Sequence, residues 1–156
     1  MSIERINDLR KIKHWHGDME VAEFVYTVGL AGEKFFRALK EGKILASKCK
    51  KCDITYLPAR AFCERCHSEI NEYIEITESG WIYTYTIQHV DKNGKKLEEP
   101  VIWAIIKFDG VEGGILHKLG EIDPEDVEIG MEVTPVFKEQ SEREGKITDI
   151  KYFKPI

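Results

Sequence analysis

Two C-x-x-C pairs constrain the folding of this chain more than any other feature of its sequence. Cys49 and Cys52 form one pair, Cys63 and Cys66 form the other, and ten residues separate them. A tetrahedral Zn²⁺ takes four thiolates at about 2.3 Å, and one C-x-x-C turn supplies two of them. The intervening segment is long enough for a hairpin that brings the two turns together. The spacing therefore predicts a four-cysteine metal site that uses every cysteine in the chain, with zinc favoured over iron.

We expect this site to be structural. Four thiolates leave no coordination position for water or substrate, and so short a segment needs metal binding as part of its folding free energy. A redox dithiol is one alternative, but it calls for a βαβ context and leaves the second pair unexplained. Covalent haem is another, because Cys63 to His67 matches C-x-x-C-H; the start of the chain, however, lacks the apolar core of an export signal.

The N-terminal part, residues 1–42, is expected to be helical. Phe35 and Leu39 fall on one apolar stripe of a helix over residues 32–42, which ends on a glycine. An earlier helix over residues 2–14 carries isoleucines at similar spacing. These helices are too few to hold a core of their own. We therefore expect their stripes to pack on the rest of the chain or on another protein.

The remaining sequence predicts strands. Residues 71–156 contain five runs rich in β-branched and aromatic residues, separated by turn-prone stretches. This pattern suits a small Greek-key barrel of the oligonucleotide/oligosaccharide-binding (OB) type, and an SH3-like barrel is the alternative. We therefore predict a mainly β protein in which helices (1–42) and a metal-binding segment (43–70) precede a five-stranded barrel (71–156). The expected strands are residues 81–87, 101–108, 114–119, 132–137 and 147–153.

Charge and aromatic residues bear on nucleic-acid binding. Residues 71–156 hold 10 Lys/Arg and 18 Asp/Glu, a local balance of −8 that would repel phosphate. Trp81, Tyr83 and Tyr85 alternate along one expected strand and should share a face. Such a row can stack on single-stranded nucleic acid. We favour the other interpretation, in which these rings fill a core.

A basic stretch surrounds the first cysteine pair. Between Lys34 and Lys51 there are seven Lys/Arg and a single acidic residue, Glu41. An ordinary solvated surface is the favoured interpretation; the alternative is a site for the phosphates of a nucleotide-bearing ligand or of RNA. The candidate ligand-binding residues are Lys48, Lys50, Lys51, Trp81, Tyr83 and Tyr85.

The sequence has no P-loop, no G-x-S-x-G and no dinucleotide-binding fingerprint, and its five histidines are scattered. We therefore expect no enzyme activity from the chain itself. The longest unbroken apolar run, residues 101–106, is far shorter than the ~20 residues that a membrane helix needs. A cytoplasmic protein without membrane association is expected, with its cysteines reduced or bound to metal.

Together these pieces resemble domain-of-unknown-function family thirty-five. The similarity covers nearly the whole chain from about residue 24. The family usually has a proline where this chain has Ala59, and another where it has Glu64-Arg65; neither departure affects a cysteine. The matching segments are residues 35–44 leading into the first cysteine pair, Tyr56-Leu57-Pro58-Ala59-Arg60 before the second pair, residues 80–86, Pro100-Val101 and residues 129–133.

The resemblance implies a rubredoxin-like ribbon with structural zinc, followed by an OB-fold. It also implies a non-catalytic partner of thiolase-superfamily enzymes, because archaeal relatives are encoded beside acetoacetyl-CoA thiolase and hydroxymethylglutaryl-CoA synthase and bridge the two. The helices and the ribbon would contact the enzymes, and the barrel would lie near coenzyme A or acyl-CoA. The leading hypothesis is an accessory or scaffold subunit of an acyl-CoA condensing complex. The alternative is a binding module for single-stranded nucleic acid.

Overall fold

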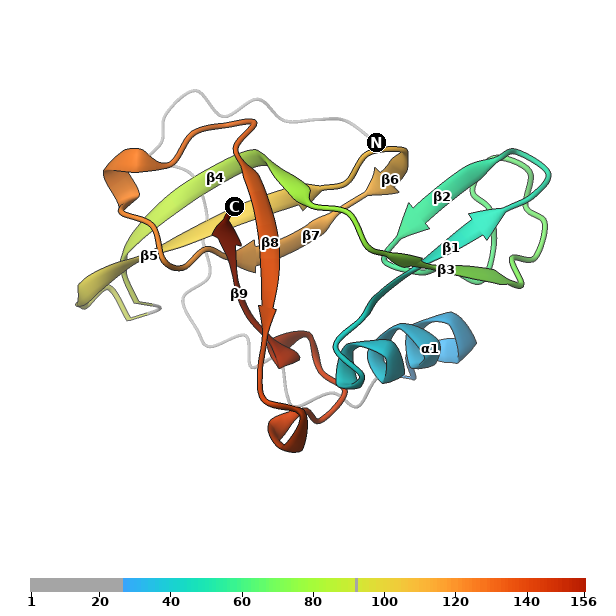
Figure 1. Ribbon diagram of the computed structural model, residues 1–156, viewed down its shortest axis with the longest axis horizontal. Helices are drawn as coiled ribbons and strands as arrows, with labels where there is room; N and C mark the ends of the chain where they lie inside the picture. Colours follow the sequence, from blue (N-terminus) through green and yellow to red (C-terminus); the bar gives the residue numbers. More distant parts are fainter. Residues whose placement is uncertain (1–26, 92) are drawn as a thin grey trace, which may run out of the picture.

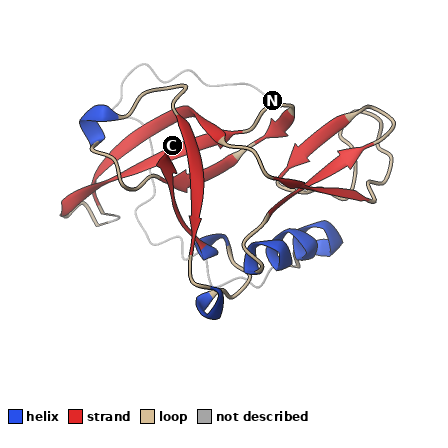
Figure 2. Ribbon diagram, viewed as in Figure 1, coloured by secondary structure: helices blue, strands red, loops and turns tan. Residues whose placement is uncertain are grey.

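The computed structural model describes residues 27–91 and 93–156, which form one α-helix and nine strands (Figure 1). Most of its regular secondary structure is strand, with helical segments around the sheets (Figure 2). The predicted mainly β fold is confirmed. No helix in the described part is long and apolar enough to cross a membrane. The elements are α1 (Gly29–Lys40), β1 (Ile44–Cys49), β2 (Ile54–Leu57), β3 (Glu72–Ile76), β4 (Gly80–Val90), β5 (Lys96–Lys107), β6 (Val111–Gly113), β7 (Ile115–Lys118), β8 (Glu132–Phe137) and β9 (Ile150–Pro155).

The helix α1 corresponds to the expected helix over residues 32–42. It begins three residues earlier, and Gly42 follows its end with a φ of 81°, a conformation that glycine adopts without strain. Phe35 and Leu39 are buried and belong to the main hydrophobic core. The apolar stripe of α1 therefore packs on the rest of the chain. The other expected helix, over residues 2–14, lies outside the described residues.

A small sheet with the strand order β3-β1-β2-β6 makes up one lobe of the molecule. β1 pairs antiparallel with both β2 and β3, so this lobe is built from neighbouring parts of the sequence. β6 comes from much later in the chain and pairs parallel with β2. This pairing ties the small lobe to the barrel, because β5, β6 and β7 follow one another directly.

The barrel has the strand order β7-β5-β4-β8-β9. Its two outer strands approach each other through an isolated parallel bridge between Leu119 and Phe153, and the Gly120 N–H donates to the Phe153 carbonyl (2.9 Å). The five expected strands thus form an OB-type barrel. The last strand starts at Ile150 rather than at residue 147, because residues 147–149 form a 3₁₀ turn. β3 was not among the expected strands.

A β-bulge changes the faces of the aromatic residues on β4. Ile82 pairs with Ile106, but the next pair joins Thr84 to Ile105, so Tyr83 is the extra residue. An extra residue shifts the two-residue alternation of a strand. Tyr83 is therefore exposed beside Trp81, whereas Tyr85 packs against the core. The expectation that these rings share one face is wrong.

A buried carboxylate holds the turn before β9. The Asp149 side chain is fully buried and accepts from the backbone N–H groups of Glu144 (3.0 Å), Gly145 (2.7 Å) and Lys146 (3.1 Å). Burial acts to raise the pKa of Asp149, but these three donors outweigh it and hold the pKa below its ordinary value. The ionised carboxylate is therefore part of the folded structure.

We expect Asp149→Asn to lower the free energy of unfolding by about 1–2 kcal/mol at neutral pH, because an amide replaces a charged acceptor. The folded-state pKa of Asp149 is depressed, so its contribution is present above the unfolded pKa of about 4 and is lost as the pH falls through the folded value. The difference between wild type and variant should therefore shrink in acid, as measured by urea unfolding across pH. The control is Asp123→Asn, at an exposed cap on Glu125. An equal loss in both variants would contradict the role of burial.

The junction between β2 and β6 requires a glycine. Gly113 has a φ of 99°, and a Cβ added there would collide with the Leu57 carbonyl oxygen. We expect Gly113→Ala to cost more than about 2 kcal/mol of unfolding free energy, with loss of cooperativity between the lobes. Gly110→Ala is the matched control, because Gly110 also has a positive φ but open space around it; it should cost only about 1 kcal/mol. Equal thermal shifts in the two variants would exclude a packing requirement at the junction.

Candidate metal centre

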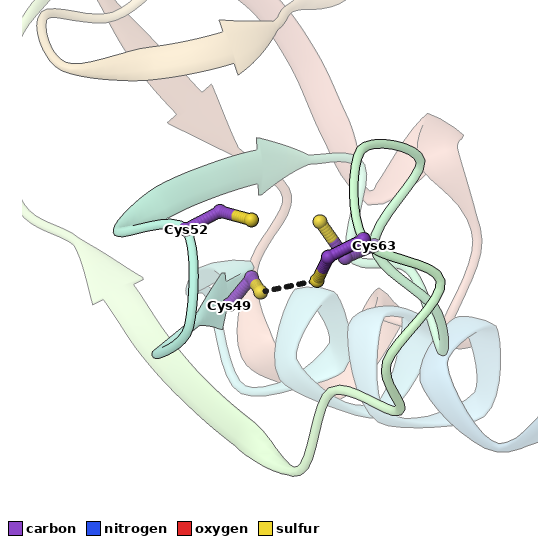
Figure 3. Close-up of side chains that lie close together, drawn as sticks. Cys49, Cys52 and Cys63 are labelled. Carbon is purple, nitrogen blue, oxygen red and sulfur yellow. Dashed lines mark hydrogen bonds between the residues drawn. The ribbon is translucent and has the colours of Figure 1, made fainter.

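Two tight turns in the small lobe bring the four cysteines together. Cys49 ends β1 and Cys52 stands just before β2, while Cys63 and Cys66 occupy the turn between Phe62 and Glu69, which form a bridge. The sulfur atoms of all four lie within 4.8 Å of one another. Figure 3 shows the side chains of Cys49, Cys52 and Cys63 directed toward a common centre. The predicted cluster is therefore present.

The dimensions of the cluster fit a tetrahedral zinc ion. The sulfurs of Cys49 and Cys66 are 3.7 Å apart. Four sulfurs at about 2.3 Å from a central ion would be about 3.8 Å from each other. Soft thiolates in this arrangement suit Zn²⁺ or iron and disfavour hard cations such as Mg²⁺. The donor set thus fits a structural metal ion.

The two turns share a backbone conformation. Asp53 and His67 directly follow the second cysteine of each pair, and their φ values are 55° and 57°. This left-handed conformation is uncommon outside glycine, and Asp and His are among the residues that adopt it more often. The His67 side chain is exposed, while its backbone N–H donates to the Cys63 carbonyl (2.9 Å). The role of His67 in this structure is therefore to close the turn.

Hydrogen bonds to sulfur favour thiolates at two of the cysteines. The Tyr56 hydroxyl lies 3.3 Å from the Cys63 sulfur and lowers the pKa of Cys63 to about 6, although burial opposes the shift. The same contact raises the pKa of Tyr56 to about 12. The Ser68 hydroxyl, 2.8 Å from the Cys66 sulfur, lowers the pKa of Cys66.

Cys52 shows the opposite behaviour. Its hydrogen bond with Cys66 and its partial burial raise its pKa, because a second thiolate beside the first is unfavourable. A cation among the sulfurs removes this repulsion. The cluster is thus suited to carry four thiolates when a divalent metal ion compensates their charge.

A separate hydrophobic cluster supports the centre. Cys49 and Cys63 are buried together with Tyr56 and Ile70. Tyr56 has no exposed surface, so its hydroxyl is held at the Cys63 sulfur by packing. Tyr56 belongs to a segment that resembles the family, but no sequence pattern indicates its contact with a cysteine. For Ser68 the local signal is its position two residues after a C-x-x-C.

Several of the basic residues near the first cysteine pair are matched by acids. Lys48 contacts Asp53 (2.8 Å), which raises the pKa of Lys48, and Lys50 contacts Glu72 (3.6 Å). Lys51 is exposed. These lysines belong to the small lobe, whereas Trp81, Tyr83 and Tyr85 lie on β4 of the barrel (Figure 1). A shared ligand for the two groups stays a prediction.

Two family models match this chain, one over the ribbon and one over the OB-fold. The family model described as "ChsH2, rubredoxin-like zinc ribbon domain" matches residues 36–72, and "ChsH2, C-terminal OB-fold domain" matches residues 73–138. A DUF35 domain-containing scaffold protein of Methanocaldococcus jannaschii is 36% identical over 126 residues, covering 78% of this chain and 88% of the relative. The chain belongs to the DUF35 family. The resemblance stated from the sequence is confirmed.

Solved structures agree with this assignment. A DUF35-family protein of unknown function from Sulfolobus solfataricus has a TM-score of 0.67 at 34% identity, over 82% of this chain and 87% of that one. A chain of the structure titled "Ltp2-ChsH2(DUF35) aldolase" has a TM-score of 0.61 at 22% identity, over 78% of this chain and 91% of that one. The DUF35 fold is thus shared with a chain of low sequence identity.

The Tyr56 hydroxyl offers a specific test of the metal centre. We expect the purified protein to hold one zinc ion, and Tyr56→Phe to weaken zinc binding about tenfold, as for other groups that contact metal ligands. The variant should also release zinc at a higher pH, because the thiol of Cys63 loses the donor that lowers its pKa. Competition with a chromophoric chelator across pH measures both effects. Tyr73→Phe, on β3, is the control, and identical behaviour of the two variants would contradict the role of the hydroxyl.

Proposed function

We propose that this DUF35 protein is a non-catalytic scaffold subunit of an acyl-CoA condensing complex, binding a thiolase, a hydroxymethylglutaryl-CoA synthase or both. The observation that carries the proposal is the relative from Methanocaldococcus jannaschii, which is named a scaffold protein and is similar over 88% of its length. The choice of a thiolase-type partner follows from the family resemblance. The fold relative in the Ltp2-ChsH2 structure, whose title names an aldolase, is consistent with an enzyme partner.

The proposal includes a division of labour along the chain. Helices (1–42) and a zinc ribbon (43–70) provide contacts with the enzyme, and the OB-fold (71–156) lies near coenzyme A. The protein is cytoplasmic. Its zinc is structural, and the zinc ligands are Cys49, Cys52, Cys63 and Cys66. The role of the zinc is to stiffen the ribbon, since a ribbon this small depends on metal binding for its folding.

Exposed apolar side chains support a docking role for α1 and the ribbon. Val28 and Leu30, at the start of α1, are 52% and 72% exposed. Phe62, next to the second cysteine turn, is 62% exposed. Aromatic side chains on a rigid support are frequent anchors of protein interfaces, because they bury a large area at a low cost in entropy.

Co-expression with a thiolase and a hydroxymethylglutaryl-CoA synthase from the same genome tests the proposal. We expect a complex that remains intact through affinity and size-exclusion chromatography, with little absorbance at 260 nm. Calorimetric titration of acetyl-CoA into the chain and into the complex then tests the contribution to coenzyme A binding. Recovery of nucleic acid without either enzyme would overturn the proposal in favour of a single-strand-binding module.

Phe62→Ala should weaken the association with the enzyme about tenfold or more, as expected for an interface anchor. The thermal stability of the isolated chain should change little, because the Phe62 ring is mostly exposed. Surface plasmon resonance against the immobilised enzyme measures the affinity. The control is Ile129→Ala, at an equally exposed apolar side chain of the barrel lobe. Weakening by Ile129→Ala but not by Phe62→Ala would place the interface on the barrel instead.

A further inference from the structure

The strand β7 has an open edge on the side away from β5. In an antiparallel pair, alternate residues direct their N–H and C=O groups toward the partner strand, and the residues between them face the other way. The N–H of Leu119 donates to the carbonyl of Ile102, just before β5 reaches Trp103. The odd-numbered residues therefore face β5. Leu116 and Lys118 direct their backbone groups outward.

The ends of this edge are occupied, and its middle is not. Gly114 and Gly120 also face outward, and their N–H groups donate to the carbonyls of Leu57 (3.0 Å) and Phe153 (2.9 Å). Between them, Leu116 has no strand partner on the outer side within residues 27–91 and 93–156, whereas the carbonyl of Lys118 belongs to the parallel bridge that joins Leu119 to Phe153. The edge thus offers the N–H groups of both residues and the C=O group of Leu116 to an incoming strand.

A groove runs beside this edge, between β7 and β9 with the turn that precedes β9. Its volume is about 620 Å³. Trp103, Leu116 and Ile147 contribute apolar surface, and Leu116 is 63% exposed. The site lies on the second and third strands of the barrel and the loop between the fourth and fifth. This is the region through which OB-folds bind extended ligands.

The charge of the groove is opposite to that of its surroundings. Lys118, Lys138 and Lys151 line it, and no described residue that lines it is acidic. Residues 71–156, which include all five barrel strands, carry 18 acidic and 10 basic residues. A local concentration of ammonium groups in an acidic lobe favours an acidic ligand, through charge complementarity.

A buried histidine adds an unused acceptor. His117 lines the groove and is only 6% exposed. Its Nε2 lies 3.3 Å from the Ile147 carbonyl and must carry the proton, because a carbonyl only accepts. Burial lowers the pKa of His117, so the ring is neutral and Nδ1 is an acceptor. Nδ1 is buried and has no hydrogen-bond partner among the described residues, so an acceptor beside the groove is left unused in this structure.

We propose that this edge and groove bind an extended, acidic segment of a partner protein, which adds to the barrel as a strand beside β7. The inference rests on the proposed scaffold function. It adds to the enzyme contacts of the helices and the ribbon a second contact, on the barrel, that holds an extended segment of a partner. Backbone groups of the segment pair with Leu116 and Lys118, its alternate apolar side chains enter the groove, and its carboxylates meet the lysines.

A fluorescein-labelled octapeptide of alternating leucine and glutamate, capped at both ends, is the probe. We expect saturable binding to the full chain in fluorescence anisotropy, weakening as salt is added. The same peptide with N-methylated backbone amides should bind at least about tenfold more weakly, because it cannot pair with the edge. A leucine–lysine peptide of the same length should not bind. Equal binding of the normal and N-methylated peptides would overturn the proposal.

Protein variants test the same contacts. Leu116→Pro removes an N–H that faces outward, so the fold should persist while the affinity falls about tenfold. Lys118→Glu should weaken binding about fivefold. The control Lys96→Glu, on β5 but outside the groove, should leave the affinity for the octapeptide unchanged. If Leu116→Pro fails to fold, the N-methylated peptide still decides the result.

Failure of this inference can be told apart from failure of the scaffold function. If the enzyme complex forms but neither the octapeptide nor Leu116→Pro has an effect, the groove is not the docking site and the scaffold function stands. Binding of decanoate but not of the octapeptide would assign the groove to a small amphipathic acid and overturn the proposal. Binding of the octapeptide without an enzyme complex would support strand addition and remove the scaffold function.

Discussion

The close approach of four thiol sulfurs, all within 4.8 Å of one another, is the constraint on which the small lobe depends. It joins the end of β1 to the start of β2 and to the second cysteine turn. Because β2 also carries Leu57, which is fully buried in the main core, the cluster and the core position the same strand from opposite ends. The pairing of β2 with β6 then connects the strand held by the cluster to the barrel.

The main core joins the parts of the chain into one body. Phe35 and Leu39 of α1, Ala46 of β1, and Ile106 of β5 belong to the same buried cluster. α1 therefore uses one face for folding and leaves Val28 and Leu30 at its start exposed. A helix that is anchored on one face and exposed at its start suits a scaffold, because a surface that binds a partner must be held rigidly and must also remain accessible.

Electrostatics differ between the two lobes in a way that matters for binding. In the small lobe, lysines are paired with acids that lie far apart in sequence, such as Lys43 with Glu75 and Lys50 with Glu72. Such pairs reduce the basic character expected from the stretch between Lys34 and Lys51. In the barrel, by contrast, three lysines and no acidic residue of the described chain line the β7 groove. The positive charge available to an acidic ligand therefore lies in the β7 groove and less in the basic stretch that the sequence shows between Lys34 and Lys51.

The cysteine cluster, the helix before it and the five barrel strands could be predicted from the sequence, because each depends on spacing within a short segment. The sequence could not predict the bulge at Tyr83, the burial of Asp149 or the edge of β7. These features depend on register and on contacts between residues far apart in the chain: Ile82 against Ile106, Asp149 beneath the turn that begins at Glu144, and Gly120 against Phe153. Local periodicity specifies which face of an element is apolar, but only tertiary pairing decides which backbone groups and charges are left for a partner.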